Sequence, residues 1–150
     1  MPRFEFRFDT ILRTRKTKED HEKTILASRM SELRQEEEAL NALDRKLNNL
    51  MDEMDTWNNQ ERIDPQLFLE YHRYFGWLKG MIAEQKELVR QAIDRVEQQK
   101  SVVVDAMKSR QIMEKLEERD FKKWRLEMER ELQKTMDEIA TQKFFKERKE

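Results

Sequence analysis

Residues 40–57, LNALDRKLNNLMDEMDTW, contain the apolar pattern that decides the fold. On an α-helix, apolar residues that alternate in steps of three and four all fall on one face, which is the pattern with which helices pair as a coiled coil. The stretch therefore predicts a helix with an apolar seam that needs a partner helix. The members of this seam are Leu40, Leu43, Leu47, Leu50, Met54 and Trp57.

Toward the N-terminus the seam becomes partly polar. One set of seam positions remains apolar back to Leu12, with Glu19 as its single interruption. The other set carries only charged residues, so we expect looser packing in this half. Its members are Arg15, Glu22, Arg29 and Glu36.

A chain reversal follows at residues 58–65. The chain has two glycines and two prolines in 150 residues, so convincing turns are rare. Asp64 before Pro65 combines an N-cap acceptor with a proline at the first helical position. We expect a first helix at about 4–58, a bend at 59–64 and a second helix at 65–148, all in one domain of residues 1–150.

The second helix carries a matching seam, in which Gln85 and Gln99 take the place of apolar residues. An antiparallel hairpin pairs residues whose numbers sum to about 125. The sequence thus predicts an all-α fold, an antiparallel two-helix coiled-coil hairpin with a longer C-terminal helix. Its expected seam residues are Leu33, Leu40, Leu43, Leu47, Leu50, Phe75, Ile82 and Val89.

The second helix is longer than the first and has no partner within the chain for roughly its last 30 residues, about 45 Å. An unpaired helix with an apolar stripe needs a partner, which favours a binding surface over a solvated end. Self-association into a crossed dimer is the alternative. The stripe consists of Phe121, Trp124, Met128, Leu132, Met136 and Ile139, followed by Phe144 and Phe145.

Near the bend, Tyr74, Trp77 and Met81 fall just off the seam. Two helices cannot bury every face of each other, so these side chains are expected to form a partly exposed patch. Exposed aromatic residues are enriched at the centres of protein interfaces. The patch is therefore a second candidate partner site.

The sequence contains nothing that indicates catalysis. There is no cysteine, the two histidines are on different arms, and no glycine-rich phosphate loop is present. We expect no catalytic residue, metal site, cofactor or small-molecule substrate. A net charge of −1 argues against nucleic-acid binding. Without a signal sequence or a membrane-spanning stretch, the protein is expected in the cytoplasm.

Three segments resemble the FliJ family of flagellar export proteins. They are FRFDTILRTRK at residues 6–16, EYHRYFGWLKGMIAEQ at 70–85 and KTMDEIA at 134–140. The resemblance extends over nearly the whole chain, with the same hairpin and long C-terminal arm. It implies a stalk-like part of the flagellar type III export apparatus, similar to the central coiled coil of the rotary ATP synthase.

The resemblance also implies partners. The paired termini would enter the flagellar export ATPase ring and activate it, through Phe4, Phe8, Leu12, Phe121, Trp124 and Met128. The bend would reach the membrane export gate protein, at the inner face of the cell membrane, through Tyr74, Trp77, Leu78, Met81 and Gln85. Escort of other export chaperones, and a need for the protein in flagellum assembly and motility, follow from the same resemblance.

Two other functions are compatible with these patterns. One is the equivalent stalk of a virulence type III secretion injectisome. The other is a structural coiled coil that dimerises through the C-terminal stripe. The export stalk predicts a monomer in isolation, whereas the structural coiled coil predicts a homodimer.

Overall fold

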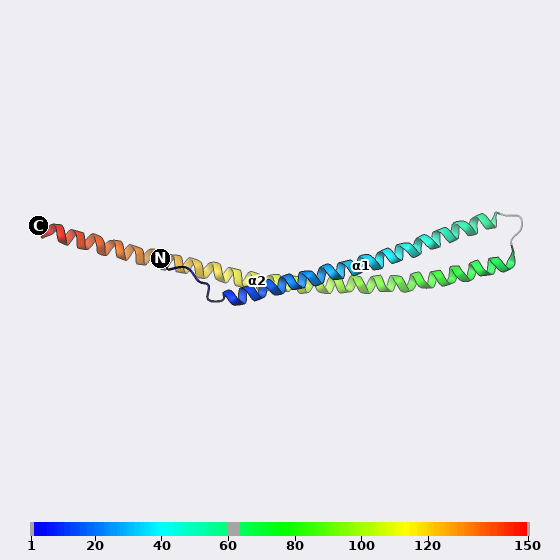
Figure 1. The fold of residues 1–150 in the computed structure, drawn as a ribbon, viewed down its shortest axis with the longest axis horizontal. Helices are drawn as coiled ribbons and strands as arrows, with labels where there is room; N and C mark the ends of the chain where they lie inside the picture. The colour runs from blue at the N-terminus through cyan, green and yellow to red at the C-terminus, as the bar shows by residue number, and fades with distance from the viewer. Residues whose placement is uncertain (1, 60–63, 150) are drawn as a thin grey trace. The chain divides into compact units, whose positions relative to one another are not determined.

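A computed structural model describes residues 2–59 and 64–149. They form two helices, α1 (Asp9–Asn58) and α2 (Pro65–Arg148), and contain no strand within these two ranges (Figure 1). The all-α helical hairpin with a longer second helix is therefore confirmed. No helix among the described residues is long and apolar enough to cross a membrane.

The start of α2 follows from Asp64 and Pro65. One carboxylate oxygen of Asp64 accepts a hydrogen bond of 3.0 Å from the Gln66 amide, and the Asp64 carbonyl accepts one of 3.0 Å from the Phe68 amide. These bonds satisfy backbone donors that a helix N-terminus otherwise leaves unpaired. The predicted N-cap is confirmed, while residues 60–63 of the expected bend lie outside the described residues.

The expected start of the first helix at residue 4 is wrong, because α1 begins at Asp9. The Asp9 amide donates to the Phe6 carbonyl at 3.2 Å, which closes a turn immediately before the helix. The Phe4 ring packs against Phe121 of α2. Phe4 buries more apolar surface against the Phe121 ring than it would on a solvated helix face, and phenylalanine has only modest helix propensity. Both effects favour the non-helical N-terminal segment.

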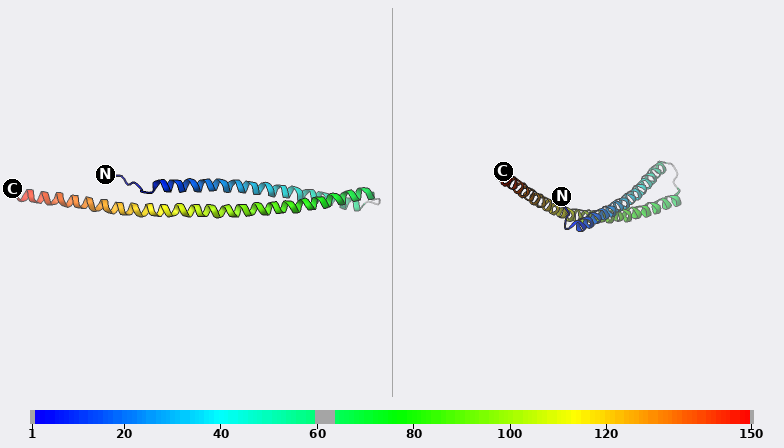
Figure 2. Two further views of the ribbon diagram at one scale, coloured as in Figure 1. Left: turned by 90° about the horizontal axis from the view of Figure 1, so that it is seen from below. Right: turned by 60° about the vertical axis from the view of Figure 1, so that its left-hand side comes forward.

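The chain divides into two compact units, each containing a stretch of both helices. Unit 1 consists of Met1–Asp20 and Asp105–Glu150, and unit 2 of His21–Val104. Within unit 2, α1 and α2 run side by side in opposite directions, as two further views show (Figure 2).

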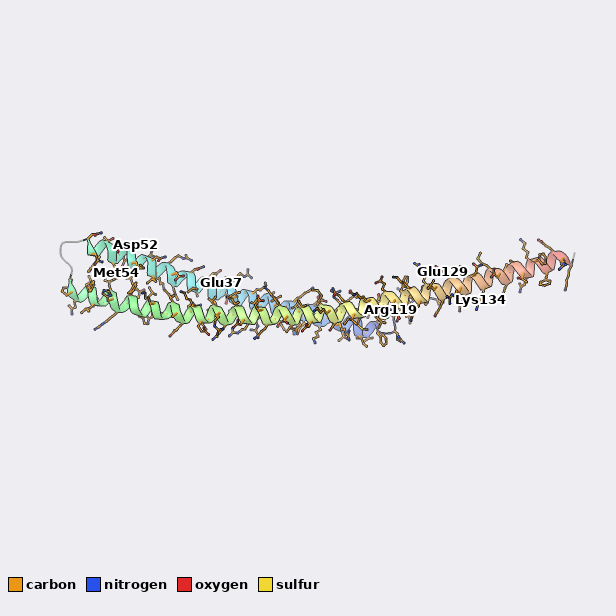
Figure 3. All side chains as sticks on the ribbon, turned by 180° about the vertical axis from the view of Figure 1, so that it is seen from behind. Glu37, Asp52, Met54, Arg119, Glu129 and Lys134 are labelled. Carbon is orange, nitrogen blue, oxygen red and sulfur yellow. The ribbon has the colours of Figure 1, made fainter. Side chains whose placement is uncertain are left out.

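Unit 2 has its apolar core close to the bend. Leu50, Leu78 and Ile82 are buried there. Seam residues that are only partly buried pack against these three: Leu40, Leu43, Leu47, Met54, Tyr71 and Phe75. Met54 is labelled in Figure 3. Leu33 and Val89 are half-buried, and small residues, Ala92 and Val96 among them, fill the seam further from the bend.

Two glycines, Gly76 and Gly80, lie four residues apart on α2, a spacing that can allow the backbones of two helices to approach closely. A Cβ atom added at either position would meet no atom within 4 Å, and α2 continues through both. The close approach is therefore not present. These glycines lie in open helix surface.

Unit 1 has a smaller buried seam, followed by a long unpaired stretch of α2. Leu12, Ala106 and Met113 are buried, together with the charged residue Glu19. Beyond the N-terminal segment, α2 continues with no other described residue beside it (orange to red in Figure 1). Glu129 and Lys134 mark this stretch in Figure 3.

Candidate partner-binding surfaces

The tip patch is an exposed aromatic surface on α2 of unit 2, formed by Tyr74, Trp77 and Met81. The rings of Tyr74 and Trp77 stack with centroids 5.9 Å apart and an interplanar angle of 24°. Tyr74 is 42% exposed and Trp77 is 59% exposed, whereas Met81 is half-buried. Stacking holds the two rings in one orientation, so a partner would meet a preformed apolar surface.

Leu78 and Gln85 occupy different surroundings from the rest of the predicted gate contact. Leu78 is fully buried in the core of unit 2. Gln85 is half-buried and donates hydrogen bonds from its side-chain amide to Glu36 of α1. Of the five predicted gate residues, only the three of the tip patch therefore present their side chains outward.

Beside the tip patch lies a small aromatic cluster, in which Tyr71 contacts Trp57 with ring centroids 5.2 Å apart. The Tyr71 hydroxyl donates to the Glu53 carboxylate at 3.3 Å. Partial burial raises the pKa of Tyr71, and the Glu53 charge and hydrogen bond raise this pKa further. A shallow hollow of about 240 Å³ opens next to Tyr71, lined also by Leu67, Glu70 and Tyr74.

The second candidate surface lies in unit 1, where the N-terminal segment crosses α2. The Phe4 ring centroid is 5.3 Å from that of Phe121 and 5.7 Å from that of Trp124. Phe121 and Trp124 in turn stack on each other at 5.9 Å. The three rings thus form one cluster, which the sequence alone could place only as separate candidates.

The other predicted ring-contact residues differ in exposure. Leu12 is 4% exposed and belongs to the seam, while Phe8 is half-buried with the Arg7 guanidinium 4.5 Å from its ring centroid. Met128 is also half-buried. Leu12 therefore lies in the seam between α1 and α2 and exposes little of its surface.

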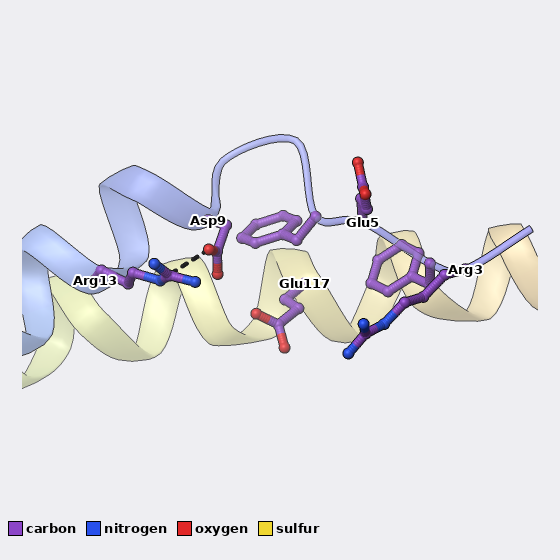
Figure 4. A pocket seen from close by; sticks show the side chains of 7 residues that line it. Arg3, Glu5, Asp9, Arg13 and Glu117 are labelled. Atoms are coloured by element: carbon purple, nitrogen blue, oxygen red, sulfur yellow. Dashed lines mark ion pairs between the residues drawn. The ribbon is translucent and has the colours of Figure 1, made fainter.

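An open hollow of about 490 Å³ lies between the N-terminal segment and α2 (Figure 4). Arg13 pairs with Asp9 at 2.9 Å at one end of it. Arg3 and Glu117 also line the hollow, together with Phe4, Glu5 and Phe6. Its charges are mixed in sign and its mouth is open, so it lacks the dry, shaped interior of a small-molecule site.

Three exposed apolar residues of unit 1 lie further along α2. Leu132, Met136 and Ile139 are 50%, 58% and 59% exposed. Their spacing keeps them on the same helix face as Phe121 and Trp124. Together with Met128, these five residues form the C-terminal stripe predicted from the sequence. The Phe4 ring packs against Phe121 and Trp124, whereas Leu132, Met136 and Ile139 are exposed.

No group of three or more His, Asp or Glu side chains within residues 2–59 and 64–149 is arranged to hold a metal ion.

Sequence reasoning missed the hydrogen bond between Glu19 and Arg110, because it treated Glu19 only as an interruption of the seam. The charge of Glu19 at an apolar position was the signal that could have revealed it.

Comparison with known proteins gives one result. A family model described as "Flagellar FliJ protein" matches residues 4–149, nearly the whole chain. No curated protein and no solved structure matches. The protein therefore belongs to the flagellar FliJ family and is a component of the flagellar protein export apparatus.

Proposed function

We propose that this protein is a non-enzymatic stalk of the flagellar export apparatus, which binds and activates the export ATPase ring and couples it to the membrane export gate. Unit 1 binds the ring, and the tip patch of unit 2 binds the gate. This role places the protein in the cytoplasm, at the inner face of the cell membrane where the flagellum is built. Escort of other export chaperones is a further part of the proposal.

The C-terminal stripe is the observation that carries the proposal. Its residues Leu132, Met136 and Ile139 expose half or more of their surface. An exposed apolar face on a helix is stabilised by docking into an apolar groove, at about 25 cal/mol for each Å² buried. The central opening of an ATPase ring offers such a groove to a single helix that extends beyond its partner.

Phe4, Phe8, Leu12, Phe121, Trp124 and Met128 form the proposed ring contact together with this stripe. The cluster of the Phe4, Phe121 and Trp124 rings supports the proposal, because contact among the three rings fixes the orientation of Phe121 and Trp124 before a partner binds. Rigid aromatic anchors lose little side-chain entropy when a partner binds. Leu12 is buried in the seam and contributes by holding α1 against α2.

The proposed gate contact is centred on Tyr74, Trp77 and Met81, with Leu78 and Gln85 behind them. The stacked rings of Tyr74 and Trp77 support it, because aromatic residues fixed at a surface concentrate binding energy. Leu78 acts by holding α2 against α1.

ATP hydrolysis by the cognate export ATPase tests the ring contact. The full-length protein should stimulate hydrolysis, and a truncation that ends at Glu118 should not. Leu132→Asp/Met136→Asp should also abolish stimulation, because it places two charges on the C-terminal stripe. The matched control Gln133→Asp/Thr141→Asp adds the same charge away from the stripe and should stimulate normally. Equal stimulation by both double variants would refute the ring contact.

Binding to the purified cytoplasmic domain of the export gate tests the tip patch. Tyr74→Ala/Trp77→Ala should weaken binding at least tenfold, since hot-spot aromatics contribute about 2 kcal/mol or more each. Leu88→Ala removes another apolar side chain of α2, 44% exposed, and should bind normally. Unchanged binding by the Tyr74/Trp77 variant would exclude the tip patch as the gate contact.

Sedimentation distinguishes the stalk from a structural homodimer. The stalk should sediment at the mass of one chain, 18.5 kDa. A stable species of twice this mass that is lost in Leu132→Asp/Met136→Asp would mean that the C-terminal stripe binds a second copy, against the stalk proposal.

A further inference from the structure

Two glutamines of α2 cross the seam of unit 2 and form the same pair of hydrogen bonds. The Gln85 Nε2 group donates to the Glu36 backbone carbonyl at 3.0 Å and also to the Glu36 carboxylate. The Gln99 Nε2 group donates to the Glu22 carbonyl at 3.0 Å and to the Glu22 carboxylate at 2.6 Å. We call each of these two contacts, Gln85 with Glu36 and Gln99 with Glu22, a rung. A side-chain amide has two N–H donors, and each rung uses both.

The two rungs are spaced equally on both helices. Gln85 and Gln99 lie two heptads apart, and so do Glu36 and Glu22. The residue midway between the two acceptors is Arg29, which pairs with Glu32 of its own helix at 3.2 Å. Acceptors and cations thus alternate with every heptad along this edge of α1.

The apolar seam does not by itself specify how α1 is aligned along α2. Leu40 and Leu47, like Leu43 and Leu50, repeat with the heptad. Sliding one helix by one heptad would again set apolar residues against apolar residues over much of the seam. A slip would change the number of residues that connect the paired parts of the helices, and the entropy of closing such a connection changes only slowly with its length.

A slip by one heptad would remove the carboxylate acceptor from both rungs. Gln85 would then face Arg29 or Leu43 in place of Glu36. Gln99 would face Arg15 or Arg29 in place of Glu22. A backbone carbonyl is present at every position, but arginine has only donors and leucine has no polar group, so one amide N–H of each glutamine would lose its acceptor.

We propose that Gln85 and Gln99, through Glu36 and Glu22, set the pairing register of α1 and α2. All four side chains are half-buried, so an unpaired amide there carries a desolvation cost that a solvated one does not. The aligned register satisfies both rungs, and each neighbouring register leaves both unsatisfied. A single buried polar residue sets register in other coiled coils by the same physics. The inference concerns how the hairpin pairs and does not depend on the proposed function.

Distance measurement between two spin labels tests the register. The chain contains no cysteine, so labels can be attached at Glu37→Cys on α1 and Gln98→Cys on α2, both exposed. The labelled parent should give one narrow distance distribution by double electron–electron resonance. In Gln85→Leu/Gln99→Leu we expect a second maximum, because a one-heptad slip moves the labels by about 10 Å along the helix axis.

A matched control carries two leucines at exposed positions. Gln35→Leu/Lys86→Leu adds the same residue type to each helix outside the seam and should keep the single distribution. A single unshifted maximum in Gln85→Leu/Gln99→Leu, with helicity retained by circular dichroism, would overturn the proposal. So would a second maximum of equal size in the control.

Reversing one rung gives a test that does not depend on the leucine variant folding. Gln85→Glu sets a carboxylate against that of Glu36 and should lower the melting temperature. Adding Glu36→Gln restores a side-chain donor opposite an acceptor, although the bond to the backbone carbonyl of residue 36 stays lost, and should recover part of the lost melting temperature and the single distance distribution. If the double exchange stayed as unstable as Gln85→Glu alone, the rung would not be setting the register.

Discussion

The carboxylate of Glu19 accepts a hydrogen bond from the Arg110 guanidinium, which joins α1 to α2 within unit 1. Glu19 is 3% exposed, at a seam position that would otherwise hold an apolar residue. Arg110 also donates to Glu114 at 2.7 Å. The bonds to Glu19 and Glu114 raise the pKa of Arg110, which favours its charged form.

Removing the arginine should destabilise the protein strongly. Arg110→Ala takes away the positive charge beside a buried carboxylate, which typically costs about 3–5 kcal/mol. We expect the lower end, near 3 kcal/mol, because the Arg110 side chain is 22% exposed and water can enter the space it leaves. Urea unfolding measures the loss, with the exposed Arg119→Ala as control. A loss below about 1 kcal/mol would show that the pair contributes little.

Replacing both partners should have the opposite outcome. Glu19→Leu/Arg110→Leu removes both charges of this pair from the seam and completes the apolar set that runs from Leu12 toward the bend. Such replacements are neutral or stabilising by about 1–4 kcal/mol. The double variant should therefore unfold at the same or a higher urea concentration than the parent. If the double variant lost as much unfolding free energy as the single variants Glu19→Leu and Arg110→Leu together, this account would be wrong.

The core near the bend should be sensitive to truncation at Leu78, which is fully buried. Leu78→Ala removes buried methyl groups and leaves a cavity, at a cost of about 2–5 kcal/mol. Leu69→Ala makes the same chemical change at a residue that is 55% exposed, and should cost less than about 1 kcal/mol. Similar losses at both sites in urea unfolding would mean that Leu78 is not part of a packed core.

The two glycines of α2 are sites for stabilisation. A methyl group at Gly76 or Gly80 would meet no atom within 4 Å, and neither glycine has a positive φ angle. Alanine is favoured over glycine inside a helix by about 0.8–1.0 kcal/mol. Gly76→Ala and Gly80→Ala should each raise the melting temperature without change in helix content. A decrease in either variant would indicate a close neighbour at that glycine.

Alkaline pH should weaken the aromatic cluster near the bend. The folded-state pKa of Tyr71 is raised above its ordinary value of 10.0 by partial burial and by Glu53. Its contribution to stability is therefore fully present below pH 10 and is lost as pH rises through the raised folded pKa. In a Tyr74→Phe background, phenolate absorbance reports Tyr71 alone among the tyrosines. Adding Glu53→Gln should lower the Tyr71 pKa part of the way; an unchanged value would exclude the Glu53 contribution.

The amino-acid sequence by itself determined the two helices and where the second begins. Apolar residues in steps of three and four, as from Leu40 to Trp57, can share a face only on a helix. Asp64 and Pro65 are favoured at a helix start because of their own chemistry, whatever surrounds them. The unpaired end of α2 follows in the same way, because helix length is proportional to residue number.

Only the tertiary structure decided what the polar seam residues and the N-terminal phenylalanines do. Gln85 finds its acceptor 49 residues away along the chain, and Glu19 finds its donor 91 residues away. Phe4 leaves the helical path because Phe121 and Trp124 offer it a larger apolar contact. In each case the position of the side chain is set by a contact with a residue far away in the sequence. The spacing of residues along one helix does not reveal which distant residue that is.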